Sequence, residues 1–249
     1  MSSCARFPEL SLSVVIPARN EEGNIGRTMP KVVASLRKNV GTFEVILIDD
    51  CSQDKTAELA NELARQYPEI VVVHNEVNLK QGGSLRRGFA MARYDWVIHN
   101  AMDYAFDFED LPDLLRHTET ADVIVAERRS YPGTTAPRRF VSSVNRGLLH
   151  ALFRVPVTDF NFIQMYRRSV LTDLPSFSQA TSFITVEKIV RAHKSGFKVV
   201  AVPATFHERV IGKPSSATVR NIAQALSDMS RLWLELRSPD KRHDTDPTP

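Results

Sequence analysis

The stretch EVILIDDCSQDKT, residues 44–56, decides the fold. Its apolar run at 45–48 is rich in β-branched residues, which is typical of a strand buried on both faces in a parallel sheet. The run ends in two carboxylates, Asp49 and Asp50, and we expect Asp54 to cap a helix directly behind them. Ligands bind at the carboxyl edge of open α/β sheets, so the two acids mark a candidate ligand site. The alternative is that they only end the strand and cap its turn.

Strands and helices alternate around this stretch. We predict further strands at 10–17, 70–74, 95–99 and 121–126, and further helices that end near residues 38, 93 and 118. The strand at 95–99 also runs into polar residues, Asn100 and then Asp103. The alternation predicts an α/β fold with a mostly parallel sheet flanked by helices.

The second half of the chain is less regular. We predict helices at 138–153, 183–195 and 218–237, an extended segment at 159–168, a strand at 197–202 and a loop at 206–213. The polar, proline-bearing residues 238–249 are expected to be disordered. We therefore expect a single domain over 1–237, with a nucleotide-binding half at about 10–126 and an acceptor half at about 127–237.

The composition is that of a globular protein with a sizeable core. Of its 249 residues, 43% are hydrophobic and 24% are charged. The formal net charge of +3 excludes wholesale electrostatic binding to nucleic acid. Arginines nevertheless gather in the middle of the sequence: Arg128, Arg129, Arg138, Arg139, Arg146 and Arg154. Such a group suits phosphate or an anionic membrane surface, and a solvated helix face explains it equally well.

The cysteines and the apolar runs bear on the compartment. Cys4 lies at the N-terminus and Cys51 beside the two acids, so we expect no structural disulfide and a reducing environment. The first residues lack the apolar core of a signal peptide, and no apolar run approaches the ~20 residues that span a bilayer. We expect a cytoplasmic protein, soluble or peripheral at the cytoplasmic face of a membrane.

Five motifs, taken in order, resemble the family-2 glycosyltransferases of the GT-A fold. They are VVIPARNEEGNI at 14–25, VILIDDCSQDKT at 45–56, a glycine loop with its helix at 78–88, SFITVEKIVRA at 182–192 and FHERVIGK at 206–213. The resemblance covers nearly the whole chain up to about residue 213. It is strongest to the polyprenyl-phosphate sugar synthases, the group that includes the dolichyl-phosphate mannosyltransferases.

The resemblance implies roles for residues at the sheet edge. The nucleotide pocket would be lined by Pro17, Asn20, Glu21, Asp49 and Asp50, with Asp50 holding the base or ribose. An Asp-x-Asp element, which carries a divalent cation such as Mg²⁺ or Mn²⁺ and the donor diphosphate, aligns with residues 101–103. The first acid is replaced by Ala101, so Asp103 is the expected metal ligand.

The resemblance also implies the reaction. A sugar, mannose or glucose, would move with inversion from a nucleotide diphosphate sugar to a polyprenyl phosphate. Arg209 and Lys213 would bind the negative charge of phosphate. Arg138 and Arg139 would bind the lipid phosphate, and Glu187 would be a positioning group. A phosphate nucleophile is ionised near neutral pH and needs no base.

Two alternatives stay open. In the first, the same fold transfers the sugar to a sugar or small-molecule hydroxyl, and Glu187 or Asp159 serves as the base. The segment after Asp159 leaves room for this reading, because Phe162-Ile163-Gln164 stands where the family often has a glycine and a basic residue. In the second, the chain is a non-catalytic relative that binds a nucleotide sugar or a partner protein.

Two predicted helices, 138–153 and 218–237, carry apolar stripes beside arginines. Each stripe either packs on the core or lies in a membrane interface. A separate membrane-anchoring subunit could also dock on the same stripe.

Overall fold

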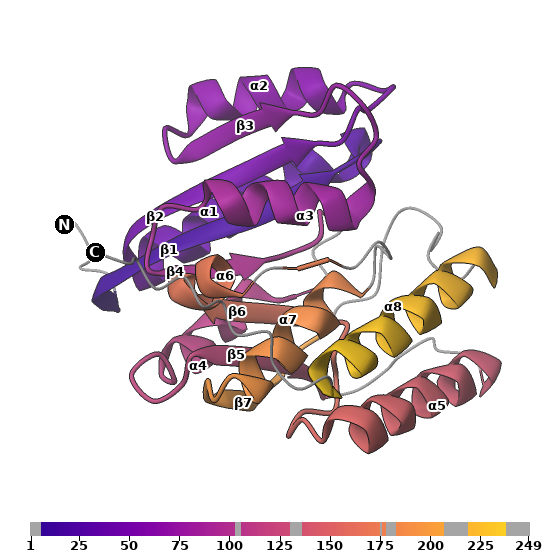
Figure 1. The fold of residues 1–249 in the computed structure, drawn as a ribbon. Helices are drawn as coiled ribbons and strands as arrows, with labels where there is room; N and C mark the ends of the chain where they lie inside the picture. The colour runs from indigo at the N-terminus through magenta and orange to yellow at the C-terminus, as the bar shows by residue number, and fades with distance from the viewer. Residues whose placement is uncertain are drawn as a thin grey trace, which may run out of the picture.

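A seven-stranded sheet with helices packed against it forms the centre of the molecule (Figure 1). The computed structural model describes residues 6–102, 106–129, 136–174, 176–177, 183–206 and 219–237, and only the backbone of 136–141 and 219–222. The predicted tail at 238–249 and most of the predicted loop at 206–213 lie outside these residues.

The strands and helices alternate along the chain. The strands are β1 (Phe7–Ala18), β2 (Val40–Asp49), β3 (Ile70–His74), β4 (Trp96–His99), β5 (Val123–Arg128), β6 (Ile163–Arg167) and β7 (Val199–Ala204). The helices are α1 (Glu22–Asn39), α2 (Thr56–Gln66), α3 (Lys80–Met91), a 3-10 turn η1 (Phe108–Asp110), α4 (Leu111–Leu115), α5 (Ala136–Phe153), α6 (Arg168–Asp173), α7 (Ile184–Lys194) and α8 (Val219–Arg237).

The strand order is β3-β2-β1-β4-β6-β5-β7. All neighbouring pairs are parallel except those of β6, which runs antiparallel to both β4 and β5. The predicted α/β fold with a mostly parallel sheet is confirmed. Because β6 is reversed, its first residues lie at the same edge as the last residues of its neighbours.

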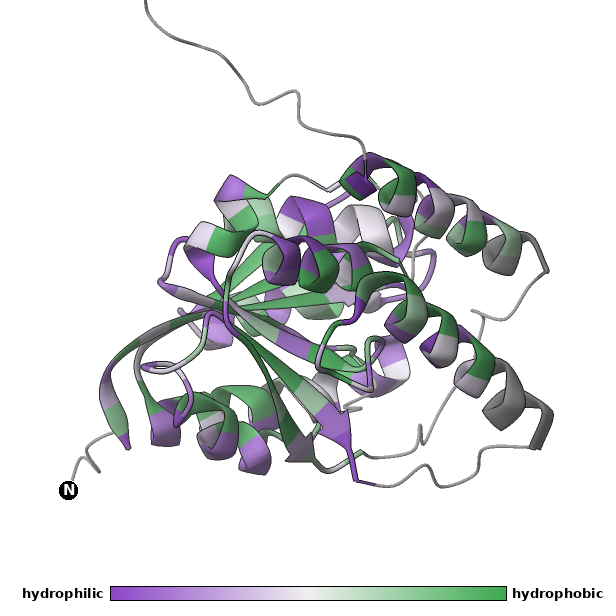
Figure 2. Ribbon diagram, turned by 60° about the horizontal axis from the view of Figure 1, so that its bottom comes forward, coloured by the Kyte–Doolittle hydropathy of each residue, from purple (hydrophilic) through white to green (hydrophobic). Residues whose placement is uncertain are grey.

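Each face of the sheet has its own apolar core. Helices α1, α2 and α4 pack with one set of strand side chains, and α3, α5, α6, α7 and α8 pack with the other. The strands between them are strongly hydrophobic (Figure 2). Helix α3 approaches the sheet most closely at Gly88, where a Cβ atom would lie 2.3 Å from Val15 Cγ1. A larger residue there would force α3 away from β1.

Three elements differ from the sequence prediction. The helix predicted over 110–118 is only η1 followed by the five residues of α4, because His117 and Thr118 donate to carbonyls three residues back and form a turn. Helix α6 was not predicted, since it follows β6 without a loop. The extended segment predicted at 159–168 narrows to the five residues of β6.

His99 is a polar residue buried at the centre of the sheet. Its Nε2 lies 2.6 Å from Gln164 Oε1 on β6, and Gln164 Nε2 donates to the Phe160 carbonyl at 3.0 Å. Burial lowers the pKa of His99 to about 4, although the hydrogen bond with Gln164 opposes that shift. The imidazole is therefore neutral at physiological pH and serves to join β4 to β6.

Acidification from pH 7 to pH 5 is expected to lower the free energy of unfolding by about 2 kcal/mol through His99. The unfolded histidine binds a proton below its usual pKa of 6.5 and the folded one only below about 4. Unfolding therefore takes up a proton between these values, so stability falls as the pH falls. Urea unfolding of the wild type and His99→Gln at both pH values measures the effect. Equal acid sensitivity of the two proteins would contradict it.

Candidate active site

The carboxyl ends of β1, β2 and β3 lie at one level of the sheet. The register pairs Ala18 with Asp49 and Asp49 with His74. One residue further on, the Asp50 N–H donates to the Ala18 carbonyl at 2.8 Å and the Asn75 N–H donates to the Asp49 carbonyl at 2.9 Å. The polar residues that follow these strands are thereby brought together.

Asp50 is the buried centre of this edge, with 3% of its surface exposed. Its Oδ1 accepts hydrogen bonds from Asn75 Nδ2 and from the Leu79 N–H, both at 2.8 Å. Asn75 Nδ2 also donates to Ser84 Oγ at 2.9 Å, and Arg87 Nη1 donates to Asn75 Oδ1 at 2.5 Å. The network joins β2, β3 and α3 around one carboxylate.

Asn75, Leu79, Ser84 and Arg87 were not among the predicted site residues. Asn75 carried a usable signal, because it directly follows β3 just as Asp50 directly follows β2. The other three lie in the glycine loop and helix at 78–88, one of the five motifs, but their contacts depend on how the 75–80 loop returns to the sheet.

Asp49 has mainly local partners. Its Oδ1 accepts from the Ser52 N–H at 3.2 Å, and its Oδ2 lies 3.3 Å from His74 Nδ1. His74 Nε2 in turn lies 3.1 Å from Asn61 Oδ1 on α2. These contacts close the turn after β2, and the place of Asp49 in a nucleotide pocket stays a prediction.

Asn20 and Glu21 lie against the turn that follows β2. The Asn20 N–H donates to Ser52 Oγ at 3.1 Å, and Asn20 Oδ1 accepts from the Gln53 N–H at 2.8 Å. The Glu21 N–H donates to Thr56 Oγ1 at 2.7 Å. The structure thus brings together two separate predicted stretches, the one after β1 and the one after β2.

Asp54 does not cap α2 as predicted. Helix α2 begins at Thr56 with Lys55 at its N-cap, which makes no side-chain capping bond. Asp54 Oδ1 accepts from the Thr56 N–H at 3.0 Å, and its Oδ2 accepts from the N–H of Glu22, the first residue of α1, at 3.2 Å. Burial opposes ionisation of Asp54, but these hydrogen bonds outweigh it and lower its pKa. Its carboxylate therefore supports the start of α1 as well.

Three residues at this edge have left-handed backbone conformations without being glycine. They are Asn20 at φ 54°, Cys51 at φ 57° and Lys80 at φ 60°. Each such residue costs on the order of 1–3 kcal/mol and persists where the surrounding contacts determine it. Asn20 and Cys51 lie in the loops after β1 and β2, and Lys80 is the first residue of α3, directly after the loop that follows β3. The strain is therefore concentrated at the candidate site.

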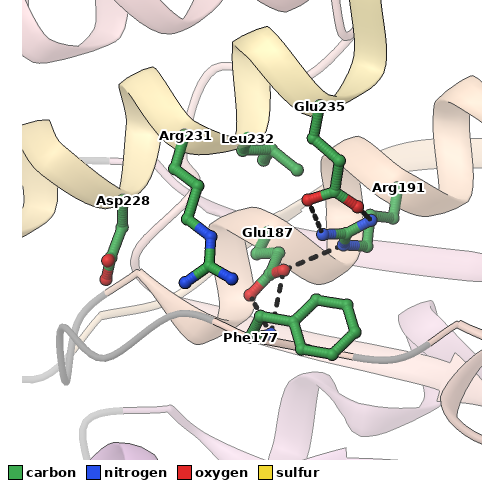
Figure 3. Close-up of a pocket in the computed structure, with 7 residues that line it drawn as sticks. All are labelled: Phe177, Glu187, Arg191, Asp228, Arg231, Leu232 and Glu235. Atoms are coloured by element: carbon green, nitrogen blue, oxygen red, sulfur yellow. Dashed lines mark hydrogen bonds and ion pairs between the residues drawn. The ribbon is translucent and has the colours of Figure 1, made fainter. Parts of the chain in front are cut away.

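Glu187, in the first turn of α7, is almost fully buried, at 2% exposed. Both of its carboxylate oxygens accept from the Phe177 N–H, each at 3.1 Å, and Oε1 also accepts from Arg191 Nε at 2.8 Å (Figure 3). Arg191 Nη1 and Nη2 donate to Glu235 on α8, each at 2.9 Å. Glu187 therefore joins α7 to its neighbours.

Asp159 is held in a similar way by Arg128, the last residue of β5. Arg128 Nε donates to Asp159 Oδ2 at 2.6 Å and Nη2 donates to Oδ1 at 2.8 Å. The guanidinium lies 5.4 Å from the ring centroids of both Phe162 and Phe206. Bidentate pairing and stacking of this kind are particular to arginine.

Two arginines of the predicted patch bind groups of the protein itself. Arg128 serves Asp159, and Arg129 Nη2 donates to the Pro203 carbonyl at 3.2 Å. Arg138 and Arg139 lie in the first turn of α5, where only the backbone is described. Their predicted phosphate contacts stay predictions.

A cation site was predicted at the end of β4. Asn100 Oδ1 accepts from the Ala101 N–H at 2.9 Å. The part of the chain that the structure describes holds no group of three His, Cys, Asp or Glu side chains suited to a metal. Asp103, Arg209 and Lys213 lie outside that part, so a cation would depend on Asp103 and on oxygens of a bound donor.

Comparison with known proteins identifies the family. The sequence model of the family described as "Glycosyl transferase family 2" matches residues 13–175. The chain belongs to glycosyl transferase family 2. The match runs from within β1 through β6 and includes the edge built around Asp50. The predicted family and enzyme class are confirmed.

The names of several curated relatives of this family-2 glycosyltransferase include a substrate. The undecaprenyl-phosphate mannosyltransferase of Micrococcus luteus is 27% identical over 90% of this chain and 94% of its own length. Glycosyltransferase AglD of Haloferax volcanii is 29% identical over 91% of this chain, and an undecaprenyl-phosphate 4-deoxy-4-formamido-L-arabinose transferase of Pseudomonas fluorescens is 26% identical over 72%. The chain spans only 38% and 54% of the lengths of these last two.

Solved structures share the fold. Glucosyl-3-phosphoglycerate synthase from Mycobacterium tuberculosis, crystallised with Mn²⁺, UDP and glucosyl-3-phosphoglycerate, matches with a TM-score of 0.66 at 20% identity, covering 93% of this chain and 82% of the synthase. The UDP complex of TarS residues 1–349 from S. aureus matches with a TM-score of 0.63 at 17% identity, covering 90% and 65%. The predicted GT-A fold is confirmed.

None of the helices within the described ranges combines the length and the apolar character needed to cross a bilayer.

Asp50→Ala is expected to weaken binding of UDP or GDP, because the carboxylate predicted to hold the base or ribose is lost. It should also lower the free energy of unfolding by about 1–3 kcal/mol, since the buried donors at Asn75 and Leu79 lose their acceptor. Isothermal titration on the folded variant measures the affinity. Glu44→Ala is the matched control, because Glu44 is a buried acid in the middle of β2, away from the strand's carboxyl end, where it accepts from Ser13 Oγ at 2.7 Å. Unchanged nucleotide affinity in Asp50→Ala would refute the role.

Proposed function

We propose that this family-2 glycosyltransferase transfers mannose or glucose from a nucleotide diphosphate sugar to a polyprenyl phosphate, with inversion at the anomeric carbon. The names of the Micrococcus and Pseudomonas relatives support an undecaprenyl-phosphate type of acceptor. The buried Asp50 network supports a nucleotide site at the carboxyl edge of β1, β2 and β3.

The choice of acceptor rests on the hydrogen bonds made by the two candidate bases. Asp159 has both oxygens bound to Arg128, and Glu187 has both oxygens bound to the Phe177 N–H and one also to Arg191. Each carboxylate is oriented by these contacts toward donors of the protein itself. A phosphate acceptor needs no base, because it is already ionised near neutral pH.

A few groups of the protein then have distinct roles in the reaction. An oxygen of the lipid phosphate attacks the anomeric carbon from the face opposite the nucleotide, and the bond to the nucleoside diphosphate breaks. Asp50 and the neighbouring Asn20–Glu21 loop hold the nucleoside. Arg209 and Lys213 offset the charge of the leaving diphosphate, and Arg138 and Arg139 bind the acceptor phosphate.

We also propose a divalent cation, Mg²⁺ or Mn²⁺, as the cofactor. Asp103 would hold it together with the donor diphosphate, which matches the preference of these ions for oxygen ligands. When bound, the cation would neutralise charge on the leaving diphosphate. The Mn²⁺ in the complex of the Mycobacterium tuberculosis synthase supports this choice.

Transfer to a lipid phosphate is expected to survive the loss of either candidate base. Radiolabelled GDP-mannose and UDP-glucose are incubated with undecaprenyl phosphate and the wild type, Glu187→Gln or Asp159→Asn. The substitutions should keep kcat within about tenfold, whereas removing a true base costs about 10²- to 10⁴-fold. Transfer confined to a hydroxyl acceptor, with a base-sized loss of kcat in Glu187→Gln, would favour the hydroxyl alternative. Hydrolysis and transfer that are both absent would favour the non-catalytic one.

The same assay tests the cation. EDTA should lower turnover by orders of magnitude because it removes the cation. Asp103→Asn should do the same, because it removes a charged ligand to the cation while the side-chain shape is kept. Activity that survives both treatments would mean that basic residues alone stabilise the leaving diphosphate.

The lipid acceptor places the reaction at a membrane, and α5 offers a suitable surface. The helix contains three arginines and no acidic residue. Val144 and Leu148, one turn apart, are 47% and 40% exposed. Leu226 and Leu234 are exposed on α8, which lies on the same side of the molecule in both views (Figures 1 and 2). We propose that the protein works peripherally at the cytoplasmic face, through this surface or through a membrane-anchoring subunit docked on it.

Arg138→Ala combined with Arg139→Ala is expected to lower turnover on polyprenyl phosphate more than it lowers donor affinity, because two positive charges near the acceptor are lost. The wild type should float with anionic vesicles, and high salt should weaken this binding by screening. Co-flotation and steady-state kinetics measure the two effects. Full activity of the double variant on the lipid acceptor would contradict this role.

A further inference from the structure

The two oxygens of the Asp50 carboxylate have different surroundings. Both protein donors, Asn75 Nδ2 and the Leu79 N–H, bind the same oxygen, Oδ1, each at 2.8 Å. Within the described part of the chain, no hydrogen bond reaches Oδ2. Asp50 Oδ2 is therefore the oxygen left to accept from a bound ligand, and the donors at Oδ1 set its direction.

The side-chain amide of Asn75 lies between groups of opposite character. It is buried, with 5% of the residue exposed, and its Nδ2 donates to Asp50 Oδ1 while its Oδ1 accepts from Arg87 Nη1 at 2.5 Å. A guanidinium offers only donors, whereas Asp50 Oδ1 acts as an acceptor. A flipped amide would set its nitrogen against the guanidinium and its oxygen against the carboxylate. Arg87 thereby fixes which end of the amide faces Asp50.

Arg87 reaches Asn75 from helix α3, which lies against β1 and β2 (Figure 1). Ser84 and Arg87 are three residues apart on this helix, a spacing at which side chains share a face. Ser84 Oγ accepts from Asn75 Nδ2 at 2.9 Å, and Arg87 Nη1 also donates to the His74 carbonyl at 3.0 Å. Ser84 is buried but Arg87 is exposed. A surface side chain thus determines the orientation of a buried amide.

The other contacts around Asn75 do not replace Arg87. The Asn75 N–H donates to the Asp49 carbonyl at 2.9 Å, which holds the backbone but not the amide. Among the described residues, Arg87 supplies the donor to Asn75 Oδ1 and no second donor reaches that oxygen. Without Arg87, a buried acceptor would be left unsatisfied, which costs free energy. Rotation of the amide would relieve that cost at the expense of its hydrogen bond to Asp50.

We propose that Arg87 is a positioning residue for the nucleotide, acting through Asn75 to set the orientation of Asp50. This inference rests on the proposed function, because Asp50 is the group proposed to hold the nucleoside. Arg87 itself touches no part of the nucleotide. The chain of contacts runs from guanidinium to amide to carboxylate, and all three groups lie in the described part of the protein.

Arg87→Met is the variant of choice, because it removes the donors and keeps much of the aliphatic stem on an exposed position. Arg87→Lys keeps the positive charge and a donor, without the planar fork. Arg65→Met is the matched control for the loss of one positive charge. Arg65 is exposed in the last turn of α2, and it makes no hydrogen bond or ion pair with the residues that the structure describes.

Hydrogen exchange of the Leu79 N–H, followed by NMR without ligand, reports on Asp50 itself, since this amide donates to Asp50 Oδ1. In Arg87→Met its exchange should be about fivefold faster, the effect of weakening one hydrogen bond. Arg87→Lys should recover part of the protection, and Arg65→Met should exchange like the wild type. In an Asn75→Ala background, Arg87→Met should add nothing.

Titration calorimetry with UDP and GDP and steady-state kinetics measure the effect on the ligand. The Kd of the nucleotide that binds and the KM of its sugar donor should rise about fivefold in Arg87→Met, again the effect of one hydrogen bond. The kcat and the KM for the lipid acceptor should not change. The matching nucleoside, uridine or guanosine, should lose affinity by the same factor, because the contact chain ends at the nucleoside and not at a phosphate.

Unchanged exchange of the Leu79 N–H in Arg87→Met would overturn the link from Arg87 to Asp50. Faster exchange with unchanged nucleotide affinity would overturn the positioning role. A loss confined to UDP or GDP and absent with the nucleoside would mean that Arg87 binds phosphate directly, which also contradicts the proposal. If the wild type bound neither nucleotide, the proposed function would fail with the positioning role, and the exchange readout would still decide the link to Asp50.

Discussion

The structure depends on satisfying one carboxylate that is buried at the end of a strand. Asp50 lies almost out of contact with water, so its charge has to be met by donors from the protein. The Leu79 N–H and Asn75 meet it from the loop after β3, and Asn75 carries the contact on to α3. The strained conformations at Cys51 and Lys80 lie in the turn after β2 and at the start of α3, which both adjoin it. The shape of the candidate nucleotide site is in this sense a consequence of burying Asp50.

Much of the fold was readable from periodicity, and the reasons for the errors are local. Buried parallel strands such as β2 and β3 are short apolar runs that end in polar residues, so their position and their shared edge followed from the sequence. The reversal of β6 did not, because an apolar run has no direction. Helix α6 was missed since it starts without a loop, and α4 proved shorter than its pattern because its last turn takes three-residue hydrogen bonds.

The site was predicted in part, and the limit is again physical. Motifs located Asn20, Glu21, Asp49 and Asp50, which the structure places in adjoining turns. They could not show that Asp159 is bound by an arginine, because Arg128 lies 31 residues away. Glu187 and Arg191 are four residues apart on α7, a spacing at which helix side chains meet, so that pair could have been predicted from the sequence. Residue type alone therefore suggested two bases, where three-dimensional contacts show two ion pairs. The same contacts support the proposed phosphate acceptor over the hydroxyl acceptor.

The place of β6 between β4 and β5 also constrains how the protein is made. During synthesis, β1 to β4 emerge in an order that lets each join a strand already present. Strand β5 emerges next, yet both of its neighbours, β6 and β7, come later in the chain. Until they are synthesised, β4 presents an open edge and β5 has no place in the sheet. The nascent chain therefore passes through a stage with exposed apolar strand edges, which is the stage at which aggregation or chaperone capture takes place.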